Sequence, residues 1–171
     1  MQKRVNFKHL DGLKVTAVFS DCKKFRYRLT IELPSIKNEK TICVIMQNPS
    51  DANSEVADKS VQFLEKLIFE KNYKELNEIG KIIIVNLYAF VQKKGFMGAK
   101  EYIGDHNDRE IKKAFKTSDI VLIAWGSNNS FEDRKKSILT ILSSFPSKNI
   151  LKTKSHPSRG TYKNFILPFT N

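Results

Sequence analysis

Short apolar runs alternate along this chain with segments of helical periodicity, and the alternation narrows the folds that the chain can adopt. The runs have the length and the continuous apolar character of strands that are covered on both faces. The expected strands are 41–46, 81–90, 119–125 and 150–154, and the expected helices are 59–71, 108–116 and 131–145. A crossover that contains a helix joins parallel strands, so this order predicts an α/β fold with three α/β/α layers and a mostly parallel central sheet.

The first 40 residues follow a different pattern. β-branched and aromatic residues dominate 15–19 and 25–33, and the polar stretch 20–24 separates them, which predicts an antiparallel β-hairpin. A length of 171 residues fits one domain with a substantial core. We therefore expect a single domain over 1–171, in which residues 1–40 form a hairpin extension and residues 41–171 form the α/β core.

The charge balance of the chain favours a polyanionic partner. Lysine and arginine together number 30 against 18 aspartates and glutamates, which gives a formal net charge of +12 and an isoelectric point of about 9.7. Such an excess attracts nucleic acid over long distances at low salt. A soluble protein from a lysine-rich proteome has the same surplus, so charge alone leaves both interpretations open.

The sequence lacks several common motifs, and their absence leads to predictions about cellular compartment and cofactors. Cys22 and Cys43 have no C-x-x-C spacing, which argues against a zinc site or a disulfide framework and favours a reducing, cytoplasmic setting. The N-terminal segment is charged and the apolar runs are short, so neither secretion nor membrane insertion is expected. No P-loop, Rossmann glycine fingerprint, G-x-S-x-G elbow or H-E-x-x-H occurs, and neither a metal nor another cofactor is expected.

Polar islands stand where the apolar runs stop. Because the carboxyl ends of parallel strands meet at one edge of an α/β sheet, these islands are expected to form one site at that edge. Each island taken singly is also explained by a turn, or by a core residue whose hydrogen bonds are satisfied. The islands are Met46-Gln47-Asn48-Pro49-Ser50, Val85-Asn86-Leu87, Ala124-Trp125-Gly126-Ser127-Asn128 and Ser155-His156-Pro157-Ser158.

The residue types suggest a chemistry for several islands. Pro49 fixes the direction in which the chain leaves the strand, so Asn48 is presented at the carboxyl end of that strand. Asn86 interrupts an apolar run, and a buried amide there must bond either a base edge or neighbouring backbone to avoid a cost of about 1–3 kcal/mol. His156 can donate to a developing anion at neutral pH, or it can lie in a surface turn. Contacts to phosphate are expected from Ser158, Arg159 and Thr161.

Two further features leave alternatives open. Asp51, Glu55 and Asp58 form an acidic cluster after the first island, and one of these carboxylates could act as a base or hold a cation. For Asp58, the favoured interpretation is the cap of the helix that begins at residue 59. Trp125 is the only tryptophan, and the glycine after it permits either a tight turn or the close approach of a ligand.

In their order along the chain, the islands resemble the motifs of the uracil-DNA glycosylase superfamily. In that superfamily a first strand ends in G-x-[DN]-P, a second carries an asparagine, a third ends in W-G, and a fourth enters H-P-S. The corresponding residues in this chain are 46–49, Asn86, Trp125-Gly126 and His156-Pro157-Ser158. The chain also resembles a family of small bacterial and phage proteins of unassigned function, through R-Y-R-L at 26–29, A-D-K-S at 57–60 and N-L-Y-A at 86–89, together with N-P-S, W-G and H-P.

The glycosylase resemblance implies roles for individual residues. Asn48 is expected to position the attacking water, and His156 is expected to stabilise negative charge on the departing base. Asn86 is expected to read the pyrimidine edge, and the backbone beside Asn48 is expected to help hold the base carbonyl. The expected base-binding residues are Gln47, Ser50, Asn86 and Trp125.

Three positions depart from the superfamily pattern. Met46 replaces the usual glycine, Ser50 stands where uracil-specific enzymes keep a tyrosine, and Arg159-Gly160 stands where a wedge residue is expected. The expected function is a DNA glycosylase-like hydrolase that flips a modified or mismatched pyrimidine base out of DNA and cleaves its N-glycosidic bond, in repair or in phage defence. The alternatives are a non-catalytic module that binds a modified base or nucleic acid, and a hydrolase of free nucleosides or nucleotides.

Overall fold

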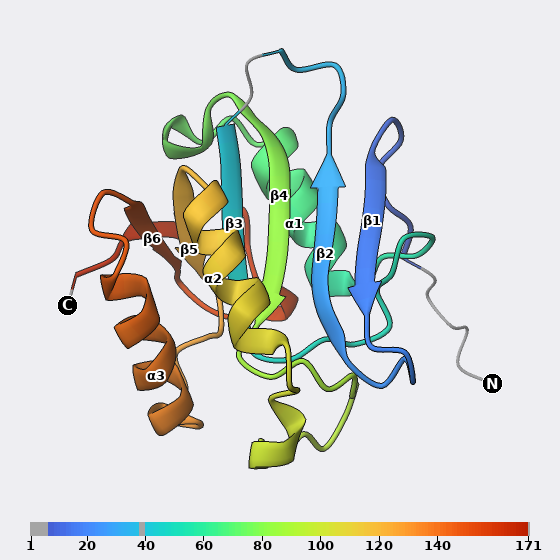
Figure 1. Ribbon diagram of the computed structural model, residues 1–171. Coiled ribbons are helices and arrows are strands. Elements are labelled where there is room, and N and C mark those ends of the chain that lie inside the picture. Colours follow the sequence, from blue (N-terminus) through green and yellow to red (C-terminus); the bar gives the residue numbers. More distant parts are fainter. Residues whose placement is uncertain (1–6, 38–39, 171) are drawn as a thin grey trace.

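The computed structural model describes residues 7–37 and 40–170, which form one mixed sheet of seven strands with helices on both faces (Figure 1). The strands are β1 (Lys14–Phe19), β2 (Arg26–Glu32), β3 (Lys40–Met46), β4 (Ile79–Asn86), β5 (Ile120–Ile123), β6 (Asn149–Thr153) and β7 (Ile166–Pro168). Their spatial order is β1-β2-β4-β3-β5-β6-β7. Strands β4, β3, β5 and β6 are parallel, whereas β1-β2, β2-β4 and β6-β7 are antiparallel pairs.

Helix α1 (Lys59–Phe69) covers one face of the sheet, and α2 (Asn107–Thr117) and α3 (Glu132–Ser143) cover the other (Figure 1). Short 3₁₀-helices occur at Lys74–Leu76 (η1), Lys100–Tyr102 (η2) and Pro157–Arg159 (η3). Strand β3 shows why the central runs are continuously apolar. Ile42 and Val44 belong to the core on the α1 side, while Cys43 and Ile45 belong to the core under α2 and α3. Within the described residues, no helix has the length and apolar character needed to cross a membrane.

The sheet corrects the expectation of a mostly parallel arrangement. The N-terminal hairpin is part of the sheet, because β2 pairs antiparallel with β4 and places Leu29 opposite Ile84. The hairpin therefore widens the sheet by two strands, although residues 1–6 of the expected extension lie outside the described residues. Strand β7 is absent from the expected elements, because a run of three residues carries too little pattern to be recognised.

Strand β4 ends earlier than its apolar sequence suggests. The expected strand continued to residue 90, but the observed one stops at Asn86. The next two N–H groups, of Leu87 and Tyr88, donate to the carbonyls of Met46 and Gln47 at 2.9 and 3.0 Å. These bonds tie the chain after β4 to the chain after β3, so the two polar islands lie side by side.

The strand order creates a crevice beside β3. The chain reaches β4 on one side of β3 through α1, and it then returns through α2 to place β5 on the other side. Ligands of open α/β sheets bind at such a switch point, outside the carboxyl ends of the strands. The four parallel strands end there at Met46, Asn86, Ile123 and Thr153.

Candidate functional site

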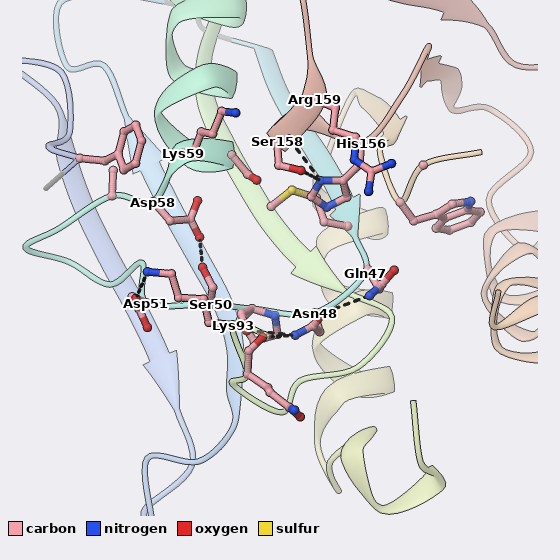
Figure 2. Close-up of a pocket in the computed structure, with 18 of the residues that line it drawn as sticks. Gln47, Asn48, Ser50, Asp51, Asp58, Lys59, Lys93, His156, Ser158 and Arg159 are labelled. Atoms are coloured by element: carbon pink, nitrogen blue, oxygen red, sulfur yellow. Dashed lines mark hydrogen bonds and ion pairs between the residues drawn. The ribbon is translucent and has the colours of Figure 1, made fainter. Parts of the chain in front are cut away.

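A cavity of about 1150 Å³ opens at this carboxyl edge, where the loops that follow β3, β5 and β6 meet (Figure 2). The N-terminal segment and the start of α1 complete its wall. Of the four polar islands that were expected to form one site, three contribute to the lining and the island around Asn86 does not. The predicted site residues found in the lining are Gln47, Asn48, Ser50, Asp51, Asp58, Trp125, His156, Ser158 and Arg159.

Asn86 and Thr161 do not line the cavity. Asn86 is 1% exposed, and its Oδ1 lies 3.5 Å from a guanidinium nitrogen of Arg26. The turn after it is held by Asn107, whose Nδ2 donates to the carbonyls of Asn86 and Leu87 at 3.0 and 3.1 Å. Thr161 is exposed beyond η3. The amide expected to read a pyrimidine therefore sits behind Arg26 and not on the cavity wall.

Asn48 is held in one orientation. Its Nδ2 donates to the carbonyl of Gln92 at 2.7 Å and to that of Pro49 at 3.3 Å, and its Oδ1 accepts from Gln47 Nε2 at 3.3 Å. Because both amide hydrogens are engaged, the side chain offers its oxygen to a ligand. A neutral amide oxygen accepts a hydrogen bond from water without taking its proton, so Asn48 can orient a water but cannot deprotonate it.

His156 enters the cavity between β6 and η3. Its Nδ1 accepts from the backbone N–H of Ser158 at 3.2 Å and lies 2.9 Å from the Ser158 hydroxyl, which places the hydrogen of the neutral ring on Nε2. Burial lowers the pKa of His156, while the charge of Asp58 opposes this effect and the charge of Arg159 adds to it. The ring is therefore neutral at pH 7, and its Nε2–H has no partner among the described residues.

Gly126 allows the end of β5 to approach His156. Its φ of +90° is one that L side chains rarely adopt, and a Cβ there would lie 3.4 Å from His156 Cβ. Trp125 before it is 8% exposed, packs in the core under α2 and α3, and also lines the cavity. Trp125 therefore contributes both to the core and to the cavity wall, and Gly126 allows the chain to turn directly after it.

Asp58 both begins α1 and faces the cavity. Its Oδ1 accepts from the N–H of Val61 at 2.8 Å, as expected of a helix N-cap, and its Oδ2 accepts from the Ser50 hydroxyl at 2.5 Å. Figure 2 shows this carboxylate across the cavity from the imidazole of His156. Asp51, the other acid in the lining, is exposed and forms an ion pair of 2.9 Å with Lys93.

The N-terminal segment closes one wall and is fixed by a buried ion pair. Phe7 lines the cavity, and its carbonyl accepts from the N–H of Ala57 at 3.2 Å. His9 bonds through Nδ1 to Glu65 at 2.5 Å and through Nε2 to the carbonyl of Asn53 at 2.8 Å. Burial acts to lower the pKa of His9, but its bonds to Glu65 and Asn53 outweigh burial and raise it. Sequence spacing gave no sign of this contact, because the partners lie 56 and 44 positions away.

Arg26 is a cavity residue that sequence reasoning missed. Regular alternation along β2 would place Arg26 on the same face as Arg28, yet Arg26 is only 1% exposed. The register of β1 and β2 shifts here, with Val18 opposite Arg28 and Phe19 opposite Arg26, so Tyr27 has no partner across the ladder. Such irregularities redirect side chains near functional sites. The shift turns Arg26 inward, where it lines the cavity.

Exposed cations stand at the cavity as well. Lys59 and Arg159 line it and have no ion-pair partner in the part of the chain that the structure describes. Across the same described ranges, no group of three or more histidine, cysteine or acidic side chains could hold a metal ion. The cavity thus combines an oriented amide, a neutral histidine, one partly buried carboxylate and several cations.

These features define an α/β protein with a mixed sheet and a polar, basic cavity at its carboxyl edge. Residues 26–159 match a family described as "Protein of unknown function (DUF1643)", and the chain belongs to this family. The match confirms the predicted membership of a family without an assigned function. It does not link the chain to the uracil-DNA glycosylase superfamily, so that resemblance stays a prediction. Neither curated proteins nor solved structures gave a match.

Proposed function

We propose that this protein hydrolyses the N-glycosidic bond of a modified or mismatched pyrimidine nucleotide in DNA, on a glycosylase-like α/β architecture. The observation that carries the proposal is the convergence of Asn48, Asp58 and His156, from three separate segments, on one cavity. Each of the three has the chemistry that one part of the reaction needs. A base must leave the stack to enter a cavity of this kind.

Each of these residues has a separate role in the proposed reaction. Water, oriented by Asn48 Oδ1, adds to the sugar carbon while the bond to the base nitrogen breaks and its electron pair leaves with the base. The Nε2–H of His156 donates to the base and stabilises the negative charge that develops on it. Asp58 supplies the negative charge that favours the positively charged sugar in the transition state. The proton released by the water finally neutralises the departing base.

DNA as the substrate is supported by the charge of the chain and by the cavity rim. The formal net charge is +12, and the exposed Lys59 and Arg159 stand where a phosphate backbone would pass. These contacts position a strand without reading its sequence. Selection of the base would then fall to the cavity itself.

Hydrolysis of a free nucleotide is the second candidate, and the packing of η3 favours it. Gly160 follows the H-P-S-R stretch, and a Cβ at this position would lie 2.3 Å from the Phe63 ring. The backbone after His156 is therefore pressed against α1, and no apolar side chain projects there to wedge open a duplex. A substrate that is already unstacked would not need such a wedge.

Base release from a panel of oligonucleotides tests the proposal. Single-stranded and duplex DNA with uracil, modified pyrimidines or mismatches would be incubated with the protein, and abasic sites would be detected by alkaline strand cleavage. We expect cleavage of at least one substrate, its loss in Asn48→Ala, and its retention in Asn149→Ala, an exposed asparagine at the opposite end of the sheet. Binding without cleavage by the unaltered protein would contradict hydrolysis and would support the non-catalytic module.

A further inference from the structure

Arg26 is held in the cavity without a carboxylate partner. One guanidinium nitrogen donates to the carbonyl of Ala52 at 2.7 Å, and the other is 3.5 Å from Asn86 Oδ1. Nε has no hydrogen-bond partner, and neither does Asn86 Nδ2 beside it. In residues 7–37 and 40–170, no acidic oxygen lies within 4.0 Å of this guanidinium.

This arrangement is unfavourable unless something else enters the cavity. A guanidinium presents five N–H donors, and a buried cation without enough acceptors is costly. Burial lowers the pKa of Arg26 to about 10 and Asp58 acts in the opposite direction, so the group remains charged at neutral pH. Asp58 cannot turn to it freely, because Val61 and Ser50 already donate to its two oxygens.

Arg134 shows how this fold satisfies an arginine that has only a structural role. It is 7% exposed, donates from Nε to the carbonyl of Leu87 at 2.7 Å, and pairs with the carboxylate of Asp108. It does not line the cavity. Arg26 differs on each count, because it lines the cavity, lacks an acidic partner and keeps Nε free.

We infer that Arg26, with Asn86 behind it, forms a subsite in the cavity for a terminal phosphate group of the substrate. The inference rests on the proposed function of the same cavity and names the class of substrate. The guanidinium of Arg26 lines the cavity with Nε unpartnered, and its planar set of donors suits the several acceptor oxygens of a phosphate monoester. An internal phosphodiester is held in the strand at the rim, whereas a terminal phosphate can extend to a residue as deep as Arg26. The substrate would be a free mononucleotide or the phosphorylated end of a strand.

Paired probes that differ only in the phosphate test this subsite. Deoxyuridine 5′-monophosphate would be compared with deoxyuridine, and a 5′-phosphorylated oligonucleotide with its 5′-hydroxyl form. Binding can be followed by the fluorescence of Trp125, the single tryptophan, which lines the cavity. A charge-assisted contact predicts that at least one phosphorylated probe binds about tenfold or more tightly than its partner. The pair that shows this preference identifies the source of the phosphate.

Variants then assign the preference to the subsite. Arg26→Gln is expected to bring the affinity ratio close to one, whereas Arg28→Gln keeps it, because Arg28 is paired with Glu110 at 3.2 Å outside the cavity. Asn86→Asp places a carboxylate beside Arg26, so it is expected to remove the preference while raising the melting temperature of the free protein. This last variant decides the matter if Arg26→Gln fails to fold.

The inference is overturned if the unaltered protein binds both members of each pair equally, or if the preference survives in Asn86→Asp. These experiments measure binding, so their outcome is independent of whether the protein releases a base. Phosphate preference without base release in any substrate would contradict the proposed function alone. Base release with no phosphate preference would contradict only the subsite.

Discussion

The two ends of the parallel strands differ in how completely their charged and polar groups are partnered. At the amino end, Lys40 pairs with Glu78 at 2.8 Å, and the Asp119 carboxylate accepts from the N–H of Thr41 at 2.8 Å. Charged groups there bond to one another or to the backbone of the neighbouring strand. At the carboxyl end, the buried guanidinium of Arg26 has no acid beside it within the described residues, and the Nε2–H of His156 faces the cavity unpaired.

The difference separates charged groups whose partners lie within the fold from groups that, in our proposal, a ligand completes. A folded protein loses free energy when a buried donor or a buried cation lacks a partner, so such groups persist where a ligand completes them. The residues at both ends flank the same strands, so strand geometry alone does not explain the contrast. The loops determine it, because those at the carboxyl end surround a cavity.

Among the variants that test this difference between the two ends, Asp58→Asn is expected to have the largest effect, which is on the rate of base release. Asparagine caps a helix about as well as aspartate, so the free energy of unfolding should fall by less than about 0.5 kcal/mol. Loss of the negative charge facing the reacting sugar should lower the rate of base release by about 10²-fold or more. Urea unfolding and single-turnover assays measure the two quantities. If the stability falls and the rate does not, Asp58 is only a cap.

A second prediction concerns the ion pair of His9 with the buried Glu65. His9→Gln leaves the fully buried Glu65 without a cation, so the free energy of unfolding should fall by roughly 3 kcal/mol at pH 6. The folded-state pKa of His9 is raised, so its contribution is fully present below the unfolded value of 6.5 and is lost as pH rises through the folded value.

Urea unfolding of both proteins between pH 6 and pH 9 checks this expectation. The difference in free energy of unfolding between the unaltered protein and His9→Gln should become smaller as pH rises. His106→Gln is the matched control, because His106 is exposed and has no carboxylate partner among the described residues. If this difference in free energy does not change with pH, the charge of His9 does not contribute to stability.

Packing under η3 gives a third prediction. Gly160 has an ordinary negative φ of −69°, so Gly160→Ala introduces no backbone strain and tests the contact with Phe63 alone. The Phe63 ring is stacked on Tyr162 with centroids 4.7 Å apart, which leaves it little room to move. We expect a loss of about 1–3 kcal/mol by urea unfolding, and recovery of part of it when Phe63→Leu is added. No recovery would mean that the two positions are not in contact.

The smallest effect is expected at the rim. If Lys59 contacts phosphate, Lys59→Ala should reduce the slope of log affinity for DNA against log salt concentration by about 0.9. Lys112→Ala is the control, since Lys112 is exposed on α2 and does not line the cavity. Fluorescence titrations at several salt concentrations give the slope. Equal slopes for both variants would remove Lys59 from the nucleic-acid surface.

Much of the fold could be predicted from the sequence, because local pattern determines it. Continuous apolar runs revealed the parallel strands, helical spacing revealed α1, α2 and α3, and Asp58 was recognised as a cap. The pairing of the hairpin with β4 and the short β7 could not be predicted in this way. Both depend on contacts between distant segments, which no local pattern records.

The candidate site could also be predicted only in part from the sequence. Asn48 and His156 follow apolar runs directly, and the rule that parallel strands end at one edge was enough to bring them together. Arg26 was missed because a register shift in the hairpin reverses its direction, and Asn86 was misplaced because β4 ends in a turn that faces Arg26. His9 was missed because its partner lies on a helix more than 50 positions away.

The central claim, that the cavity at the carboxyl edge releases a base, is tested most directly with His156. Free base released in a single turnover would be measured by mass spectrometry for the unaltered protein, His156→Ala and His106→Ala. Removing the donor to the departing base should slow release by about 10²–10³-fold in His156→Ala and leave His106→Ala unchanged. Equal rates for all three proteins, each shown to be folded, would contradict the account.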